Sequence, residues 1–105
     1  MGAMSRLLTD DEVSRQLADL PGWEREGDAI VATIEAPDFP AAIRIVRAAA
    51  EDAEQMNHHP DIDIRWRTTR WLLTTHAAGG LTQLAVELAP RIVEAARAEG
   101  ATPGE

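Results

Sequence analysis

The feature that most constrains the fold of this chain is a long segment with helical periodicity that ends beside two histidines. Between residues 39 and 57, apolar side chains recur at steps of three and four, which is the spacing of one face of an α-helix. Asp38 is the expected N-cap. Pro60 disfavours helical geometry at His59, so we expect the helix to end near Asn57. The side chains predicted to face a core are Phe39, Ile43, Val46, Ala50, Ala53 and either Met56 or Asn57.

Two pairs of short segments flank this helix and have the alternating pattern of strands. Residues 23–26 and 29–35 are separated by Gly27–Asp28, which predicts one hairpin. Residues 61–67 and 70–75 form the second pair, with a turn expected near 67–69. Because each pair is only partly apolar, the pattern indicates a sheet with one solvated face.

Two further helices are predicted, one near each end of the chain. Thr9 and Glu12 can form a capping box, and Pro21–Gly22 ends the first helix. Thr82 is the expected N-cap of the last helix, in which Pro90 removes one hydrogen bond and predicts a kink. The apolar stripe of this last helix comprises Leu84, Leu88, Ile92 and Ala95 or Ala96.

The order helix, strand, strand, helix, strand, strand, helix predicts a two-layer α+β domain. We expect a four-stranded antiparallel sheet with the three helices on one face. A chain of 105 residues corresponds to one domain, which we place at residues 4–99. Residues 1–3 resemble a cloning scar before a start at Met4, and residues 100–105 are expected to be a disordered tail.

Charge and composition argue against several classes of function. A net charge of −8 does not suit a protein that binds nucleic acid or an anionic membrane, because both need a basic surface. No stretch approaches the roughly 20 apolar residues of a membrane span, and no signal peptide is seen. The chain has no cysteine, which excludes disulfides and fits a cytoplasmic protein.

The three histidines all lie at the ends of predicted elements. His58 and His59 end the long helix, and His76 ends the last strand, so the three imidazoles could converge at one rim of the domain. A histidine at a helix C-terminus commonly binds free carbonyl groups, and the pattern alone supports that structural role and a site equally. Imidazoles titrate near neutral pH, which favours acid–base catalysis as the functional interpretation. A zinc site formed by Glu54, His58 and His76 ranks below it, because no recognised ligand spacing is present.

Aromatic and basic side chains give weaker indications. We expect Trp66 in the core, whereas Trp23, which follows a Pro-Gly turn, fits either the core or a stacked ligand. Arg65, Arg67 and Arg70 form a local basic patch, whose simplest interpretation is a solvated strand face.

Two motifs appear when the histidines are read together with their neighbours. The first is Glu54-x-x-Asn57-His58-His59-Pro60, and the second is Thr74-Thr75-His76-x-x-Gly79-Gly80-Leu81-Thr82. Together they resemble the pterin-4a-carbinolamine dehydratase family. The resemblance extends to LTDDEV and LPGWE near the N-terminus and covers the chain from about residue 7 to residue 96. The fold of that family, a four-stranded antiparallel sheet with three helices on one face, agrees with the element order predicted above.

The resemblance implies a reaction and the residues that perform it. Family members dehydrate 4a-hydroxytetrahydropterin to quinonoid dihydropterin, in the recycling of the tetrahydrobiopterin used by aromatic amino-acid hydroxylases. The pterin is then the substrate, no cofactor or metal is required, and a homo-oligomer (dimer or tetramer) is expected. By position, His58 and His76 match the acid–base pair and His59 matches a third histidine of the catalytic site. The positions that match substrate contacts are Asn57, His58, His59, Pro60, Thr74, Thr75, His76 and Ala77, with Glu54 as a carboxylate near the pocket.

This sequence departs from the family at two positions that are often acidic. The family pattern Gly-Leu-Thr-x-x-Asp places an acid near the catalytic histidine, and here that position is Ala85. The second position is Ala77. These departures imply the alternative function, a catalytically impaired pterin-binding or protein-interaction module of the same fold.

Overall fold

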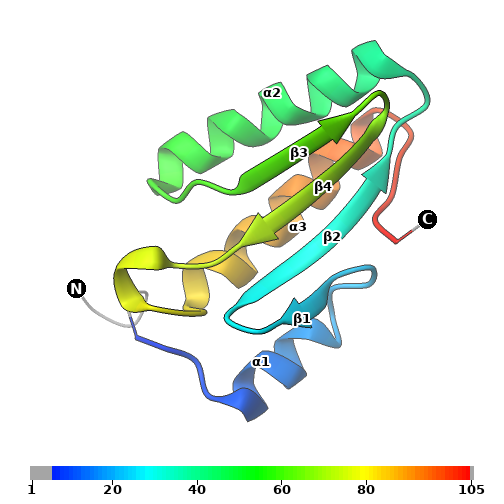
Figure 1. Cartoon of the computed structure of the whole chain (residues 1–105). Coiled ribbons are helices and arrows are strands. Elements are labelled where there is room, and N and C mark those ends of the chain that lie inside the picture. The colour runs from blue at the N-terminus through cyan, green and yellow to red at the C-terminus, as the bar shows by residue number, and fades with distance from the viewer. Residues whose placement is uncertain (1–5, 105) are drawn as a thin grey trace.

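A computed structural model describes residues 6–104, in which four antiparallel strands form one sheet in the order β1-β2-β4-β3. The helices lie on one side of this sheet (Figure 1). The proposed cloning scar lies outside the described residues. No helix among residues 6–104 is long and apolar enough to cross a membrane. The elements in chain order are α1 (Asp10–Leu17), β1 (Glu24–Glu26), β2 (Ala29–Glu35), α2 (Phe39–Met56), β3 (Asp61–Arg65), β4 (Thr68–Leu73), the short 3-10 helix η2 (His76–Ala78) and α3 (Gln83–Ala98).

Alternation along β2 and β4 gives the sheet one buried face and one solvated face. The register places Ile30 opposite Leu73, and both side chains are fully buried, as is the neighbouring Trp71. Thr33 lies opposite Arg70 on the other face, and both are exposed. The predicted two-layer α+β architecture is therefore confirmed.

The capping signals read from the sequence are also confirmed. Thr9 Oγ1 accepts the Glu12 N–H at 3.1 Å, and the Thr9 N–H donates to the Glu12 carboxylate at 2.8 Å. Asp38 caps α2 by accepting the Ala41 N–H at 2.9 Å. At its other end, α2 stops at Asn57, which adopts a left-handed conformation with φ 51°. Asparagine tolerates this conformation better than most residues, so α2 ends directly before His58.

The helix α2 faces the core mainly through alanine side chains, together with Ile45. Ala42, Ile45 and Ala49 are fully buried, whereas Phe39 is 48% and Ile43 42% exposed. The predicted core stripe of α2 is therefore right at Val46, Ala53 and Met56, which are buried in the core or packed against it. It is wrong at Phe39, Ile43 and Ala50, which are exposed. Apolar side chains surround so much of this helix that their spacing does not select one face. Alanine also lets the helix approach the sheet and α3 closely.

The helix α3 continues from Gln83 to Ala98 with Pro90 inside it. Pro90 is exposed, and because it has no N–H it cannot donate to the carbonyl of Val86, its usual partner in an α-helix. The predicted core positions Leu88 and Ile92 are fully buried.

The turn between β3 and β4 comes earlier than the sequence predicts. β3 ends at Arg65, and Trp66 occupies the turn with φ 56° and a side chain that is 71% exposed. The prediction that Trp66 lies in the core is wrong, because the strand alternation that would point it inward ends one residue earlier. The guanidinium carbon of Arg67 lies 5.1 Å from the centre of the Trp66 rings. Trp23 and Trp71, in contrast, are buried.

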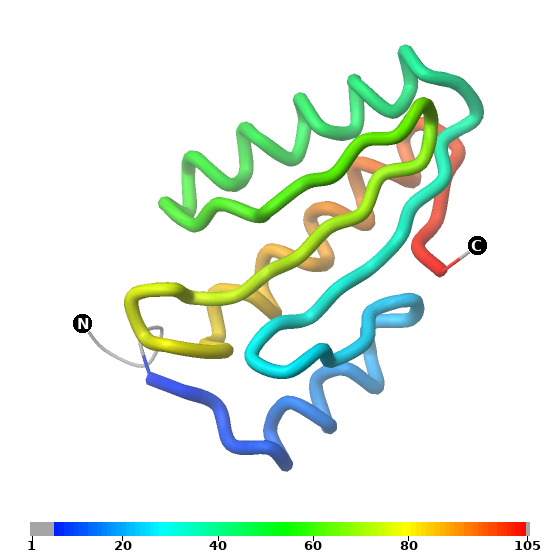
Figure 2. The backbone as a smooth tube through the Cα atoms, viewed as in Figure 1, coloured from blue at the N-terminus to red at the C-terminus, as the bar shows by residue number. Residues whose placement is uncertain are grey.

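The C-terminal segment lies beside β2 (Figure 2). The Gly104 N–H donates to the Thr33 carbonyl at 2.9 Å, Pro103 pairs with Ile34, and Ala101 is buried. β1 pairs only with the first residues of β2, so this segment covers an edge that β1 leaves open. Residues 101–104 are therefore packed against the domain where the sequence predicts a disordered tail.

Candidate active site

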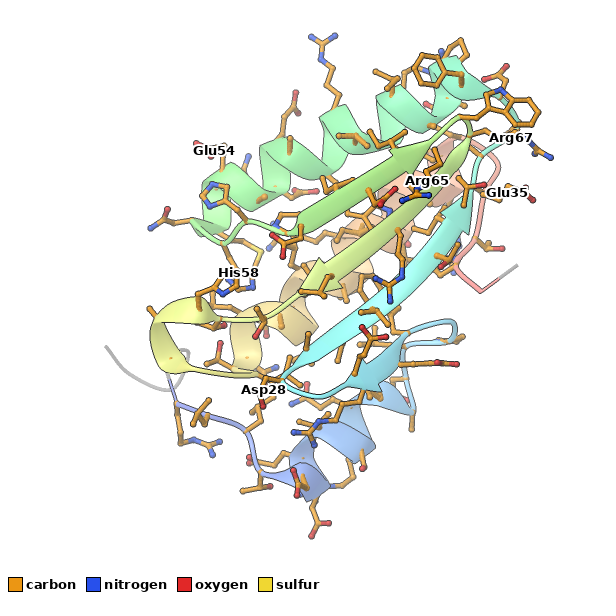
Figure 3. All side chains as sticks on the ribbon, in the orientation of Figure 1. Asp28, Glu35, Glu54, His58, Arg65 and Arg67 are labelled. Carbon is orange, nitrogen blue, oxygen red and sulfur yellow. The ribbon has the colours of Figure 1, made fainter. Side chains whose placement is uncertain are left out.

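The two histidine motifs meet at one cavity of about 450 Å³. One wall comes from the end of α2, and the other comes from the segment between β4 and α3. In Figure 3 the labelled His58 lies between these two segments. The cavity is lined by Asn57, His58, His59, Thr74, Thr75, His76, Ala77, Ala78 and Leu84.

His58 is the buried member of the three histidines. Its N–H donates to the Ala53 carbonyl at 3.0 Å, which fixes the main chain directly after α2. The residue is only 6% exposed, and its Nε2 has no hydrogen-bond partner among the described residues. Burial lowers the pKa of His58 below its ordinary value of 6.5, and the charges of His59 and His76 lower it further. His58 is therefore neutral at neutral pH.

His59 is exposed and pairs with a carboxylate from the preceding turn of α2. The Nε2 atom of His59 lies 2.6 Å from Oε2 of Glu54. Both side chains are more than half exposed, so this contact orients the imidazole and adds little to stability. Glu54 does not line the cavity itself, and its contact with the cavity wall is the one with His59.

His76 lies on η2, a single turn that the sequence analysis did not anticipate. The Thr75 carbonyl accepts the N–H groups of Ala78 and Gly79 at 3.0 Å and that of Gly80 at 3.3 Å. The Thr75 N–H in turn donates to the Gly80 carbonyl at 2.9 Å. Gly79 has φ +78°, a conformation that glycine adopts freely. This closed loop presents His76 immediately after β4.

Some predicted site residues lie elsewhere. Pro60 does not line the cavity, and its structural effect is to end the helix before it. Of the two positions that lack an acid, Ala77 lines the cavity, whereas Ala85 is fully buried in the hydrophobic core. The change at position 77 therefore alters the cavity wall directly, and the change at position 85 does not.

Two residues of the cavity wall, Ala78 and Leu84, were not predicted as site residues. The available signal for Leu84 was its place in the first turn after the Thr82 cap, close in sequence to the histidine motif. For Ala78 the signal was the glycine pair that follows it, which closes the loop.

Metal-binding geometry is not found in the described part of the chain. Within residues 6–104, no group of three or more His, Cys, Asp or Glu side chains is placed to hold a metal ion. The carboxylate of Glu54 contacts His59 instead of joining His58 and His76, so the zinc alternative has no geometric support.

Acidic neighbours neutralise the predicted basic patch. Its interpretation as a solvated strand face is confirmed for Arg65 and Arg70, which are exposed on β3 and β4, whereas Arg67 lies in the turn between them. Figure 3 shows the labelled Arg65, Arg67 and Glu35 near the β3–β4 turn. The ion pairs join Arg65 to Asp63 at 3.2 Å, Arg67 to Glu35 at 3.4 Å and Arg70 to Glu26 at 3.0 Å.

Comparison with known proteins agrees with this site. The family model for Pterin 4 alpha carbinolamine dehydratase matches residues 6–95. A protein of Nocardia farcinica that bears the pterin-4-alpha-carbinolamine dehydratase name is 53% identical over 93 residues, which cover 89% of this chain and 98% of that protein. A protein of the same name from Mycobacterium tuberculosis is 51% identical over 83 residues, covering 79% and 88%. This chain belongs to the pterin-4a-carbinolamine dehydratase family.

A solved structure extends the comparison to the fold. The crystal structure of a transcriptional coactivator/pterin dehydratase from Brucella melitensis matches with a TM-score of 0.84 at 29% sequence identity. The match covers 87% of this chain and 99% of that chain, so the two share the whole domain.

Proposed function

We propose that this chain is a hydro-lyase that dehydrates 4a-hydroxytetrahydropterin to quinonoid dihydropterin in tetrahydrobiopterin recycling. Family membership supports the reaction, because the relatives bear the name of that activity. The observation that carries the proposal is the convergence of His58, His59 and His76 on one cavity from two separate motifs. A volume of about 450 Å³ lies within the usual range for small-molecule sites.

The proposed reaction breaks the C4a–O bond of the pterin and forms a C4a=N5 double bond. An acid protonates the leaving hydroxyl, which departs as water, and a base removes the N5 proton. The sum is the loss of one water with no oxidation or reduction. Two imidazoles can perform both proton transfers near neutral pH, so the proposed mechanism uses no cofactor and no metal.

We assign the base to His58 and the acid to His76. Burial keeps His58 neutral, which a proton acceptor requires. His76 is exposed on η2 and can be reprotonated from solvent after each turnover. His59, oriented by Glu54, binds the pterin from the same wall. The remaining proposed substrate contacts are Asn57 and the main chain of Thr74, Thr75, His76 and Ala77.

The test is a dehydration assay in which 4a-hydroxytetrahydropterin is generated in situ by a hydroxylase. We expect the purified protein to accelerate dehydration well beyond the uncatalysed rate. The double variant His58→Ala/His76→Ala, purified in the same way, measures any contaminating host enzyme. A wild-type rate equal to the uncatalysed rate refutes the proposed activity.

We also propose that the chain acts in the cytoplasm as a homo-oligomer, a dimer or a tetramer. β3 is an edge strand of the sheet, and exposed edges and apolar patches are commonly covered by a partner. Asp61 and Arg65 place opposite charges at the two ends of β3, so an antiparallel second copy would bring unlike charges together. The exposed apolar side chains near this edge are Phe39, Ile43, Ile64 and Trp66.

A further inference from the structure

Two threonine hydroxyls meet beside the cavity. Oγ1 of Thr75 and Oγ1 of Thr82 are 2.8 Å apart. Thr75 lines the cavity, whereas Thr82, the N-cap of α3, is fully buried and does not line it. The contact thus joins the loop that carries His76 to the helix that supplies Leu84 to the cavity wall.

The direction of this hydrogen bond follows from the burial of Thr82. Its Oγ1 already accepts the Leu84 N–H at 3.3 Å. The hydroxyl proton also needs an acceptor, because a buried donor without a partner is strongly unfavourable. Among the described residues, Thr75 Oγ1 is the acceptor within hydrogen-bonding distance of this hydroxyl. Thr82 therefore donates, and Thr75 accepts.

That direction leaves the hydroxyl proton of Thr75 available, since a hydroxyl that accepts a hydrogen bond keeps its own O–H. We propose that Thr75 donates this hydrogen bond to an acceptor on the bound pterin, and that Thr82 fixes the Thr75 hydroxyl in the donating orientation. Ring carbonyl and ring nitrogen atoms of a pterin are suitable acceptors. The inference rests on the proposed function and adds a side-chain donor to the main-chain contacts proposed above.

Both threonines are held by their main chains, so the donor is in place before the ligand binds. The Thr75 main chain closes the loop from residue 75 to residue 80 through both its N–H and its carbonyl. Thr82 pairs with Leu7 in an isolated bridge, and the neighbouring Leu81 carbonyl accepts the Leu8 N–H at 2.8 Å. A donor fixed in this way loses little freedom on binding.

The test measures binding of 7,8-dihydrobiopterin, which lacks the 4a-hydroxyl and is not dehydrated, by calorimetry. We expect Thr75→Val to weaken binding about 3–10-fold, the effect of one neutral hydrogen bond, and Thr75→Ser to bind like the wild type. Thr82→Val should weaken binding by a similar factor from outside the cavity, and Thr82→Ser should not. The double variant Thr75→Val/Thr82→Val should bind no more weakly than Thr75→Val alone.

A matched control separates positioning from loss of a helix cap. Thr9→Val removes the N-cap of α1, away from the cavity, and should leave pterin binding unchanged. In turnover, loss of the donor should raise KM while kcat changes little, which a general loss of stability would not produce. If Thr82→Val does not fold, Thr82→Ala, which also lacks the hydroxyl, takes its place, and the two Thr75 variants still decide the role of Thr75.

The failure of this inference can be told apart from failure of the proposed function. If the wild type binds dihydrobiopterin and Thr75→Val binds equally tightly, only the role of Thr75 is overturned. Additive losses in the double variant overturn the role of Thr82. If the wild type neither binds dihydrobiopterin nor dehydrates the carbinolamine, the proposed function fails and this inference fails with it.

Discussion

His58 and His76 line the same cavity but differ in their surroundings. His58 is buried, and its Nε2 has no hydrogen-bond partner within residues 6–104, whereas His76 is exposed on a short loop. Burial disfavours the charged form of an imidazole, and this supports the proposed assignment of the base to His58. One residue type can thus supply both catalytic roles in the proposed reaction.

We predict that His58→Ala and His76→Ala each lower kcat by about 10²–10⁴, the range usual for a general acid or base. Steady-state kinetics of carbinolamine dehydration measure the change. Arg47→Ala is the control, because Arg47 is exposed on α2 and does not line the cavity. A variant of either histidine with a rate close to that of the wild type would require a different residue for its role.

The lowered pKa of His58 also predicts a pH dependence of stability. The unfolded chain binds a proton at this histidine near pH 6.5, whereas the folded chain binds it only at lower pH. Because the unfolded state takes up the proton first, falling pH favours unfolding. The stability that is linked to neutral His58 is fully present above about pH 6.5. It is lost as the pH falls toward the lowered pKa of His58 in the folded chain.

Urea unfolding at about pH 7.5 and about pH 5.5 tests this dependence. We expect the wild type to lose stability at the lower pH and His58→Gln to lose less. Glu12 does not interfere, because a hydrogen bond from Arg6 lowers the pKa of its carboxyl from 4.5 to about 2, and the stability linked to it is lost only below that window. Equal losses in the two proteins would contradict the assignment to His58.

The histidines at the cavity could be predicted from the sequence, but the full set of residues that form its wall could not. His58 and His76 are conspicuous because both end an element, and elements end at the rim of a two-layer domain. Leu84 reaches the cavity only because α3 packs beside the loop after β4, and Thr82 meets Thr75 for the same reason. Contacts between distant segments depend on packing that local patterns do not contain.

At the scale of elements, helix starts were predictable because capping is local chemistry. Thr9 and Asp38 each bond to an N–H three residues later, so their sequence neighbours suffice to identify them. The buried face of α2 was only partly predictable, because its alanines give a weak hydrophobic signal against Phe39 and Ile43. Trp66 was misplaced because a small shift of a turn moves a side chain from one environment to another.

The packed C-terminal segment predicts a steric effect at Gly22. A Cβ atom there would lie 2.6 Å from the carbonyl carbon of Pro103, and its φ is +87°. Gly27 is the matched control, since its φ is +63° and no described atom lies within 4 Å of such a Cβ. Both alanine variants incur the left-handed conformation, which costs about 1–2 kcal/mol. Gly22→Ala should lower the free energy of unfolding by at least about 1 kcal/mol more than Gly27→Ala does.

Deletion of residues 101–105 tests whether contact with Pro103 causes the extra loss of stability in Gly22→Ala. Without Pro103, Gly22→Ala and Gly27→Ala should lower the free energy of unfolding by similar amounts, as measured by urea denaturation. If Gly22→Ala remains the more damaging variant in the shortened chain, the clash involves another group.

At the scale of the whole molecule, the cavity and the exposed side chains of Phe39, Ile43 and Trp66 lie at opposite ends of α2. In Figure 1, α2 begins beside the β3–β4 turn. It ends at Met56, directly before Asn57 and His58, which line the cavity. Its 18 residues span about 27 Å at 1.5 Å per residue. A partner that covers Phe39, Ile43 and Trp66 can therefore bind without closing the proposed site.

This separation gives the last prediction, that oligomerisation can be removed without removing pterin binding. We expect light scattering to give the wild type two or four times the 11.4 kDa mass of one chain, as a dimer or a tetramer requires. Ile43→Asp, which places a charge on a side chain already 42% exposed, should yield the 11.4 kDa monomer and still bind dihydrobiopterin. Leu7→Asp, which charges another exposed apolar residue far from Ile43 in the sequence, should keep the wild-type mass. A monomeric wild type, or an unchanged mass for Ile43→Asp, would show that this end of α2 is not the contact between copies.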